Sequence, residues 1–464
     1  MRRKPTEFGL VVVGGGAGGI SAARAGARRG VRTLLVQDGP IGGDCTFTGC
    51  VPSKALIEAT MRGAPFSEAM ASVRRSIETI AATETADVLR REGVEVLEGC
   101  ARFTAPRELD VAGRTVRAAQ VVVATGARPE IPLIEGLGDI PYLTNENVFE
   151  LVDAPRALLV LGGGAIGCEL AQAFRRMGTA VTIVERLPHL VSHEEPETTT
   201  VIEATFAAEG IDVATGRSVT RAEVVADGKV GVTLDDGSWL TVDRILVAVG
   251  RRAMTDGLDL SAAGIDTDDR GFITTDDHLA TTASGVYAVG DVAGKLQFTH
   301  AADEMGRIAV ANAFGRRKTR FDPSWIPAVT YTSPEIGRVG KTEAEAADVG
   351  GRVAYLPMSE VDRAIVAGRT AGFVKLIAGP RRVLGNVGGG RVLGATVVSE
   401  RGGEVVHEAV LAMRTGMFTG RLAQSVHAYP SWSVAMQQAA AQFFMEIGGR
   451  TARPARRAGA AGDV

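Results

Sequence analysis

Two stretches of the chain repeat one order of apolar and glycine-rich segments. Residues 9–13 (GLVVV) are apolar, a glycine-rich turn follows, residues 20–29 carry small residues at helical spacing, and residues 31–36 are again apolar. The same order returns over residues 157–161, 162–167, 168–177 and 180–184. A buried strand, a tight turn, a helix and a second strand make a βαβ unit. The sequence therefore predicts an α/β fold with two Rossmann-like dinucleotide-binding domains.

The rest of the pattern divides the chain into segments. Helices are predicted within residues 52–91, short strands at 94–97 and 121–124, hairpins over 219–242, and strands returning to the first domain at 271–290. A strand-rich segment begins near residue 322 and precedes helices predicted at 404–413 and 434–446. We predict a first domain from residues 1–150 and 271–321, a second from 151–270, a C-terminal α+β domain from 322–448, and a disordered tail at 449–464.

Composition removes several function classes. The 464 residues carry a net charge of −3, which gives no electrostatic footprint for nucleic acid or an anionic membrane surface. No run approaches the roughly 18 apolar residues of a membrane span, and the basic start at Arg2 and Arg3 leads into no cleavage site. Four cysteines in so long a chain do not indicate a secreted disulfide scaffold. We therefore expect a cytoplasmic protein without nucleic-acid or membrane partners.

Both glycine-rich turns have the G-x-G-x-x-G spacing. The first glycine permits a tight turn, the second lets the backbone approach a pyrophosphate, and the third allows the helix to pack closely on the strand. The two sets are Gly14, Gly16 and Gly19, and Gly162, Gly164 and Gly167. Two such motifs, each between a strand and a helix, imply two bound dinucleotides, and FAD with NAD(P)H is the natural pair.

The residue that ends each second strand bears on the nucleotide. Glu185 lies where an acidic side chain binds the adenosine ribose, and its charge would repel a 2′-phosphate. This favours NADH, although the adjacent Arg186 leaves NADPH open; the bland alternative is a solvated carboxylate at a strand end. In the first unit the matching position is Gln37, followed by Asp38, and both are candidate ribose contacts.

Cys45 and Cys50 lie in the most informative segment, GGDCTFTGCVPSK at residues 42–54. In an ideal α-helix, cysteines five positions apart would have Cα atoms roughly 8–9 Å apart, too far for an unstrained disulfide, and Gly49 can supply the break. Pro52 suits the first turn of a helix, whose positive end favours a Cys50 thiolate. Two unrelated buried thiols, or metal ligands, are the alternatives; zinc would need further Cys or His partners that this segment lacks.

The segment resembles the redox motif of the pyridine nucleotide–disulfide oxidoreductase family, which includes dihydrolipoamide dehydrogenase and mercuric reductase. The resemblance extends from Gly9 to about Glu446 and includes the motifs Ala124-Thr125-Gly126, Val249-Gly250-Arg251, Val289-Gly290-Asp291 and residues 331–336 (YTSPEI). It implies an FAD-binding first domain, an NAD(P)-binding second domain, and a C-terminal domain that forms a homodimer.

The resemblance also implies roles for individual residues. Cys45 would be the outer thiol that meets the substrate, and Cys50 the inner thiol that contacts the flavin. Lys54 would lie near the flavin and pair with Glu169. Contacts to the cofactors are implied for Thr125, Gly126, Gly250, Arg251, Gly290 and Asp291.

The chain departs from the family where the usual acid/base histidine and its orienting glutamate belong. Tyr429 and Val434 stand at those positions, and His427 lies two residues before the first. Unperturbed tyrosine is protonated at neutral pH and is a poor base. Either Tyr429 or His427 is left as the candidate acid/base. The C-terminal cysteine pair of mercuric reductases is absent as well.

These observations favour an enzyme that passes hydride from the nicotinamide through FAD to the Cys45–Cys50 disulfide, and then reduces a small-molecule disulfide. The alternatives are a metal-ion or quinone reductase, a dihydrolipoamide dehydrogenase, and a non-catalytic flavoprotein redox sensor. No resident metal ion is expected.

Overall fold

The computed structural model describes residues 6–457, whose contacts form two compact units. The first contains residues up to 133, 141–154 and 246–323, and the second contains 134–140, 155–245 and 324 onward. Residues 246–270, which the sequence pattern assigned to the second domain, therefore group with the first unit. The predicted second and C-terminal domains together form the second unit. No helix among the described residues is long and apolar enough to cross a membrane.

A seven-stranded sheet lies at the centre of the first unit, in the order β3-β2-β1-β6-β5-β4, with β16 also paired to β6. The parallel strands are β3 (Val94–Glu98), β2 (Thr33–Gln37), β1 (Thr6–Val13), β6 (Arg114–Val123) and β16 (Val286–Ala288), and the antiparallel strands are β5 (Glu108–Val111) and β4 (Ala101–Ala105). Val13 lies opposite both Val36 and Val123, so three strands end together where the first glycine turn begins.

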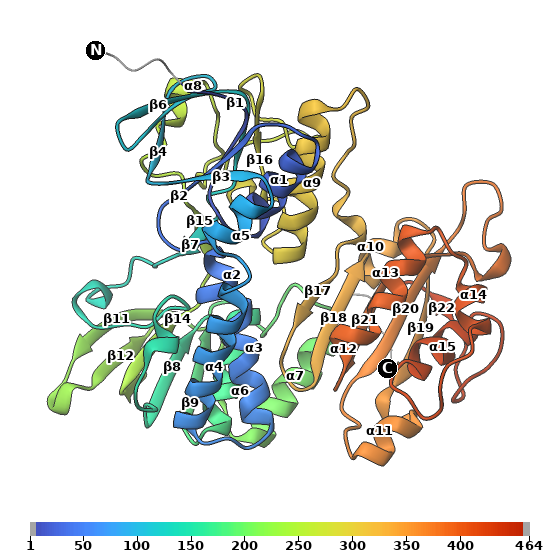
Figure 1. Cartoon of the computed structure of the whole chain (residues 1–464). Coiled ribbons are helices and arrows are strands. Elements are labelled where there is room, and N and C mark those ends of the chain that lie inside the picture. The colour runs from blue at the N-terminus through green and yellow to red at the C-terminus, as the bar shows by residue number, and fades with distance from the viewer. Residues whose placement is uncertain (1–5, 458–464) are drawn as a thin grey trace, which may run out of the picture. The chain divides into compact units, whose positions relative to one another are not determined.

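Helices surround this sheet and carry the cysteine segment. They are α1 (Ala17–Arg28), α2 (Gly43–Phe47), α3 (Cys50–Met61), α4 (Phe66–Ala81), α5 (Ala86–Arg91), α8 (Leu260–Ala263) and α9 (Thr299–Phe314). α1 and α9 lie side by side (Figure 1). A small antiparallel pair, β7 (Ala127–Pro129) with β15 (Arg251–Ala253), adds Arg251 to this unit.

The second unit contains the second βαβ motif. Its four-stranded sheet has the order β10-β9-β8-β14, formed by β10 (Asp212–Thr215), β9 (Ala180–Glu185), β8 (Ala157–Leu161) and β14 (Arg244–Val247), where the chain passes into the first unit. The helices are α6 (Ala165–Arg176) and α7 (Pro196–Glu209), and β11 (Val219–Val224), β12 (Val230–Leu234) and β13 (Trp239–Val242) form a separate antiparallel sheet. The α/β class with two dinucleotide-binding motifs is confirmed.

A six-stranded antiparallel sheet dominates the C-terminal part of the second unit, in the order β17-β18-β21-β20-β19-β22. Its strands are β17 (Ala328–Thr330), β18 (Glu335–Gly340), β21 (Arg391–Ser399), β20 (Phe373–Gly379), β19 (Arg352–Pro357) and β22 (Arg453–Pro454). Its helices are α10 (Glu343–Ala347), α11 (Asp362–Ala367), α12 (Gly402–Val405), α13 (His407–Arg414), α14 (Thr419–Gln424) and α15 (Val434–Ala441).

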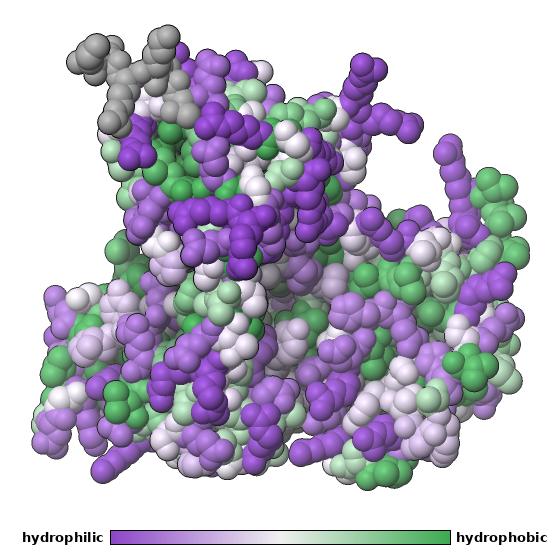
Figure 2. Space-filling model, in the orientation of Figure 1, coloured by the Kyte–Doolittle hydropathy of each residue, from purple (hydrophilic) through white to green (hydrophobic). Residues whose placement is uncertain are grey.

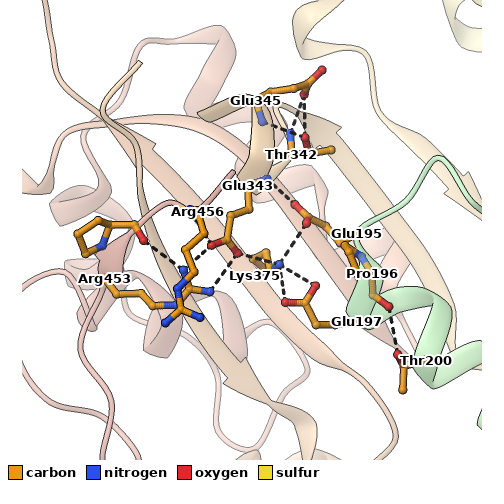
Figure 3. Close-up of polar contacts among 11 residues, drawn as sticks. Glu195, Pro196, Glu197, Thr200, Thr342, Glu343, Glu345, Lys375, Arg453 and Arg456 are labelled. Carbon is orange, nitrogen blue, oxygen red and sulfur yellow. Dashed lines mark hydrogen bonds and ion pairs between the residues drawn. The ribbon is translucent and has the colours of Figure 1, made fainter. Parts of the chain in front are cut away.

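The strand β22 corrects the expectation of a disordered tail at residues 449–464. Arg352 and Val353 of β19 pair with Pro454 and Arg453, and Arg453 also forms an ion pair with Glu343 (Figure 3). The low apolar content of this segment hid a strand that is held by edge pairing and charge. The remaining residues of that prediction, 458–464, lie outside the described residues.

Candidate active site

The first glycine turn, between β1 and α1, is shaped for close backbone contact. Gly14 has a φ of 106°, which favours glycine, and a Cβ on Gly19 would lie 1.8 Å from the Gly14 carbonyl oxygen. No side chain caps α1 at Gly16. The N–H groups of the first helical turn and the helix dipole therefore favour an anion. This is the geometry of a pyrophosphate cradle.

The second glycine turn, between β8 and α6, repeats these features. Gly162 has a φ of 111°, and a Cβ on Gly167 would lie 2.0 Å from the Gly162 carbonyl oxygen. Gly164 caps α6 without a side-chain hydrogen bond, and, apart from its chain neighbours and the adjoining helix backbone, no described atom lies within 4 Å of the place where its Cβ would be. The chain thus builds two cradles of one kind, one in each unit.

The residues that end β9 and β2 brace these turns. One oxygen of the Glu185 carboxylate accepts a hydrogen bond from the Gly163 N–H at 2.6 Å, and the other accepts one from a backbone N–H at 2.7 Å. Gln37 holds the turn of the first unit in a similar way. Its Oε1 accepts a hydrogen bond from the Gly15 N–H at 2.5 Å, and its Nε2 donates one to the Asp38 carbonyl at 2.9 Å. Both side chains end a strand beside a cradle, as the sequence predicted.

Cys45 and Cys50 lie on different helices, α2 and α3, on either side of Gly49. Gly49 has φ −119° and ψ −116°, and a Cβ there would lie 2.9 Å from the Asp44 carbonyl oxygen. The break expected between the cysteines is therefore present. Cys50 is the first residue of α3, and Pro52 lies in the first turn. The positive end of the helix stabilises a thiolate at Cys50.

The two thiols interact directly. A hydrogen bond to Cys50 and burial both raise the pKa of Cys45, so Cys45 keeps its proton when one of the pair ionises. Cys50 is exposed, and its sulfur lies 3.5 Å from the Thr299 hydroxyl at the start of α9. Such a pair can hold two electrons as dithiol and release them as disulfide.

The other two cysteines lack these features. Cys168 is fully buried on α6, and burial raises its pKa. Cys100 is exposed and donates to the Asp38 carboxylate at 2.9 Å, and this hydrogen bond raises its pKa. Cys100 and Cys168 therefore both favour the inert thiol form, and the redox role of Cys45 and Cys50 remains a prediction.

A chain of charges borders the cysteine segment. One guanidinium nitrogen of Arg251, Nη2, lies 2.8 Å from the Asp44 carboxylate, and Arg251 Nε lies 3.4 Å from Asp291. Burial raises the pKa of Asp291 to about 6; Arg251 opposes the shift, and the charges of Asp44 and Cys50 add to it. Asp291 therefore interacts electrostatically with Arg251, Asp44 and Cys50.

The residues around Asp291 fit a flavin dinucleotide. The Thr125 hydroxyl is buried and has no hydrogen-bond partner within the described part of the chain. Gly126, Gly250 and Gly290 have φ values of 78°, 141° and 72°, which keep side chains out of these turns. A buried hydroxyl and a carboxylate are the groups that a polyol such as the ribityl chain would use.

Lys54 and Glu169 lie in different units. Lys54 is on α3, about one helical turn after Cys50. Glu169 is on α6, is 4% exposed, and accepts a hydrogen bond from the Tyr331 N–H at 2.8 Å. The implied Lys54–Glu169 pair remains a prediction.

Tyr429 is poorly suited to act as a base. Its side chain is exposed, and its hydroxyl donates to the Asp362 carboxylate at 2.8 Å, which raises the pKa of Tyr429. Val434 begins α15 and offers no polar group. A tyrosine whose pKa lies above its usual value holds its proton more firmly at neutral pH.

His427 instead forms a pair with a glutamate that the sequence motif did not indicate. Its Nε2 lies 2.9 Å from the Glu408 carboxylate and its Nδ1 lies 2.9 Å from the Ser425 carbonyl. Burial lowers the pKa of His427, but the hydrogen bonds to Glu408 and Ser425 outweigh it and raise the pKa. Both ring nitrogens face acceptors, so the doubly protonated ring can satisfy both of them, and an acid/base role of His427 remains a prediction.

Four residues near the Cys45–Cys50 segment and near His427 were not predicted from the sequence. They are Asp44, Asn145, Thr299 and Glu408. Only Asp44 carried a signal, as a carboxylate directly before a redox cysteine. The other three come from distant parts of the sequence and are brought in by the fold.

Known proteins confirm the assignment that the two cradles and the thiol pair indicate. The model of the pyridine nucleotide-disulphide oxidoreductases matches residues 8–306, and that of their dimerisation domain matches residues 326–440. The chain belongs to this family. It is 36% identical to a dihydrolipoyl dehydrogenase of Thermus scotoductus, over 93% of this chain and 96% of that protein. It is 34% identical to a mercuric reductase of Streptomyces lividans, over 96% and 98%.

Solved structures of this family agree. The Cu(II) complex of the HOCl-induced flavoprotein disulfide reductase RclA of Escherichia coli superposes with a TM-score of 0.87 at 27% identity, over 94% of this chain and 99% of that one. LpdA of Mycobacterium tuberculosis superposes with a TM-score of 0.85 at 28% identity, over 95% and 100%. The chain is therefore an FAD-dependent oxidoreductase with a dimerisation domain at residues 326–440.

Proposed function

We propose that this enzyme takes reducing equivalents from NADH, stores them in Cys45 and Cys50, and delivers them to an acceptor at Cys45. The hydrogen-bonded thiols of Cys45, on α2, and Cys50, at the start of α3, carry this proposal. Bound flavin would supply hydride acceptance from the nicotinamide and electron transfer to the disulfide. The two glycine turns would orient the cofactors, the start of α3 would favour ionisation of Cys50, and the hydrogen bond between the thiols would keep a proton on Cys45.

A small disulfide is the acceptor that this thiol pair fits best. The Cys45 sulfur would attack one sulfur of the acceptor disulfide, and its proton would pass to the departing thiolate, which leaves a mixed disulfide on Cys45. The Cys50 thiolate would then attack Cys45, release the second half of the acceptor as a thiolate and reform the Cys45–Cys50 disulfide. This exchange proceeds here without the family's usual histidine–glutamate dyad, since Tyr429 and Val434 occupy those positions. Slow turnover with dithiols near neutral pH is the consequence, because no neutral base accepts their proton.

A metal ion is the second candidate acceptor. The replacement of the usual histidine–glutamate dyad by Tyr429 and Val434 favours it, because reduction of a bound metal ion needs no proton from a departing thiol. Among the relatives are mercuric reductases, and one similar structure is a Cu(II) complex. Thiolates bind such soft ions strongly.

The Cys45→Ser variant separates reduction through the thiol pair from reduction of a quinone directly by the flavin, with Cys100→Ser as the matched control. The assay follows NADH oxidation with 5,5′-dithiobis(2-nitrobenzoate), with Hg(II) and with menadione. Disulfide reduction should fall by at least about 100-fold in Cys45→Ser and stay unchanged in the control. If disulfide reduction survives in Cys45→Ser, the proposal is wrong. If only menadione reduction is appreciable in the wild type, electrons leave directly from the flavin.

We infer that NADH is preferred over NADPH. Two backbone N–H groups fix the Glu185 carboxylate at the end of β9. There it would accept hydrogen bonds from the ribose hydroxyls of NADH and repel the 2′-phosphate of NADPH. The preference is measured as the ratio of kcat/KM for the two nucleotides.

We infer a homodimer as the working form. Large apolar side chains are exposed in the dimerisation domain, including Val383 at 90%, Val387 at 64% and Val426 at 97%. The face in Figure 2 is mostly hydrophilic, with smaller apolar areas that include the outer loop between β20 and β21. These residues lie within the segment that matches the family's dimerisation domain, and a second copy of the chain would cover such apolar surface. Light scattering of the FAD-loaded protein would test the dimer.

A further inference from the structure

We propose that the ion pair of Asp44 and Arg251, next to the cysteine segment, sets how readily the Cys45–Cys50 disulfide accepts electrons, with the carboxylate opposing reduction and the guanidinium favouring it. The inference rests on the proposed function of Cys45 and Cys50 as a redox pair. It concerns the charge that surrounds the pair rather than the identity of the acceptor.

Asp44 joins the cysteine segment to two distant parts of the first unit. It lies directly before Cys45, in the first turn of α2. One carboxylate oxygen accepts hydrogen bonds from Asn145 Nδ2 at 3.1 Å and from the Thr48 hydroxyl. The other oxygen lies 2.8 Å from Arg251 Nη2. Asn145 also donates to the Thr48 carbonyl at 3.2 Å, so both ends of α2 are tied to one amide.

Arg251 is fixed in place and largely buried. Its side chain is 11% exposed, and its Nη2 donates to the Ala127 carbonyl at 2.6 Å. A buried guanidinium requires compensating carboxylates. Asp44 and Asp291 are the two carboxylates paired with it. Asp44 therefore supplies one of two compensating carboxylates, and it is the residue directly before Cys45.

The charge balance of the redox step gives the direction of the effect. Two electrons and one proton break the Cys45–Cys50 bond and produce one thiol and one thiolate, so the product has one more negative charge than the disulfide. The electrons come from NADH through the flavin. A nearby carboxylate opposes this new charge, and a nearby guanidinium favours it.

Two substitutions should therefore shift the potential of the pair in opposite directions. Asp44→Asn should make the disulfide easier to reduce, and Arg251→Gln should make it harder. We expect changes of about three- to tenfold in the equilibrium constant, and tenfold corresponds to about 30 mV for a two-electron couple. Arg251→Lys keeps the charge and should return the potential towards that of the wild type. Asp87→Asn, at an exposed surface pair on α5, is the charge-matched control and should cause no shift.

The experiment equilibrates each FAD-loaded enzyme with dithiothreitol redox buffers at pH 7 without oxygen, and follows the thiolate–flavin charge-transfer absorbance. Shifts of opposite sign for Asp44→Asn and Arg251→Gln would support the proposal. Shifts of the same sign, or none, would overturn it, because a loosened fold would move both variants alike. If Asp44→Asn fails to retain FAD, the Arg251→Gln and Arg251→Lys pair decides the question. A wild type without the absorbance band would overturn the proposed function itself.

Discussion

Replacing Lys375 by methionine should destabilise the second unit by about 3–5 kcal/mol at pH 7, the cost of removing one partner from a buried ion pair. The ammonium of Lys375, 1% exposed, lies 3.1 Å from Glu195, 2.7 Å from Glu197 and 3.1 Å from Glu343 (Figure 3). Methionine keeps nearly the length of the side chain but removes the cation. Arg453 still pairs with Glu343, whereas Glu195, 3% exposed, is left without a cation.

The pH dependence of this loss has a definite sign. Burial lowers the pKa of Lys375, but Glu195 and Glu197 outweigh it and raise the pKa above 10.5, so its contribution is complete at pH 7 and is lost only at alkaline pH. Burial raises the pKa of Glu343, but Arg453 and Lys375 outweigh it and lower the pKa below 4.5. The wild type therefore loses this stabilisation as the pH falls below 4.5, and its advantage over the variant shrinks there.

Thermal unfolding at pH 7 and at pH 4 measures both effects. At roughly 2–4 °C per kcal/mol for a unit of this size, Lys375→Met should lower the Tm by about 6–20 °C at pH 7. Lys341→Met, at an exposed position of the same unit, is the control and should change the Tm little. A loss at pH 7 no larger than that of the control, or a loss that grows between pH 7 and pH 4, would refute this account of the cluster.

Three further predictions follow from the described contacts. Burial raises the pKa of Glu335 to about 7, although the hydrogen bond from the Gly403 N–H opposes this shift. The wild type therefore loses stability as the pH rises from about 4.5 to 7. Glu335→Gln should raise the Tm at pH 8 and leave it unchanged at pH 4. The raised pKa of His427 means that its Glu408 pair stabilises the fold below about pH 6.5 and loses that contribution as the pH rises further. His427→Gln should thus lower the Tm more at pH 6 than at pH 9, without changing the pH profile of kcat. Glu185→Gln should reduce the kcat/KM preference for NADH over NADPH by about tenfold, the factor for about 1.4 kcal/mol.

Much of the fold could be predicted because local pattern and tertiary position agree. The apolar run at residues 157–161 is β8 with the predicted bounds, since both faces of a parallel strand are buried. The predicted helix at 434–446 is observed as α15, which ends at Ala441. The edge strand β22 was missed because edge pairing leaves little hydrophobic pattern to detect.

The candidate site divides in the same way. Glycine spacing and the Cys45–Cys50 segment carry their chemistry locally, so the cradles and the thiol pair could be predicted. The Asp44–Arg251 ion pair joins positions about 200 residues apart, and no local pattern predicts which carboxylate a buried arginine will meet. The His427–Glu408 pair could not be predicted from the family motif, because that motif places the partner glutamate of the histidine at the position of Val434.

Anaerobic titration of the FAD-loaded enzyme with NADH tests the central claim most directly. If Cys45 and Cys50 receive the electrons, two-electron reduction should give a long-wavelength charge-transfer band from the Cys50 thiolate to oxidised flavin, and Cys50→Ser should abolish it. Bleaching of the flavin by the first equivalent of NADH, without that band, would contradict the account and leave the cysteines outside the electron path.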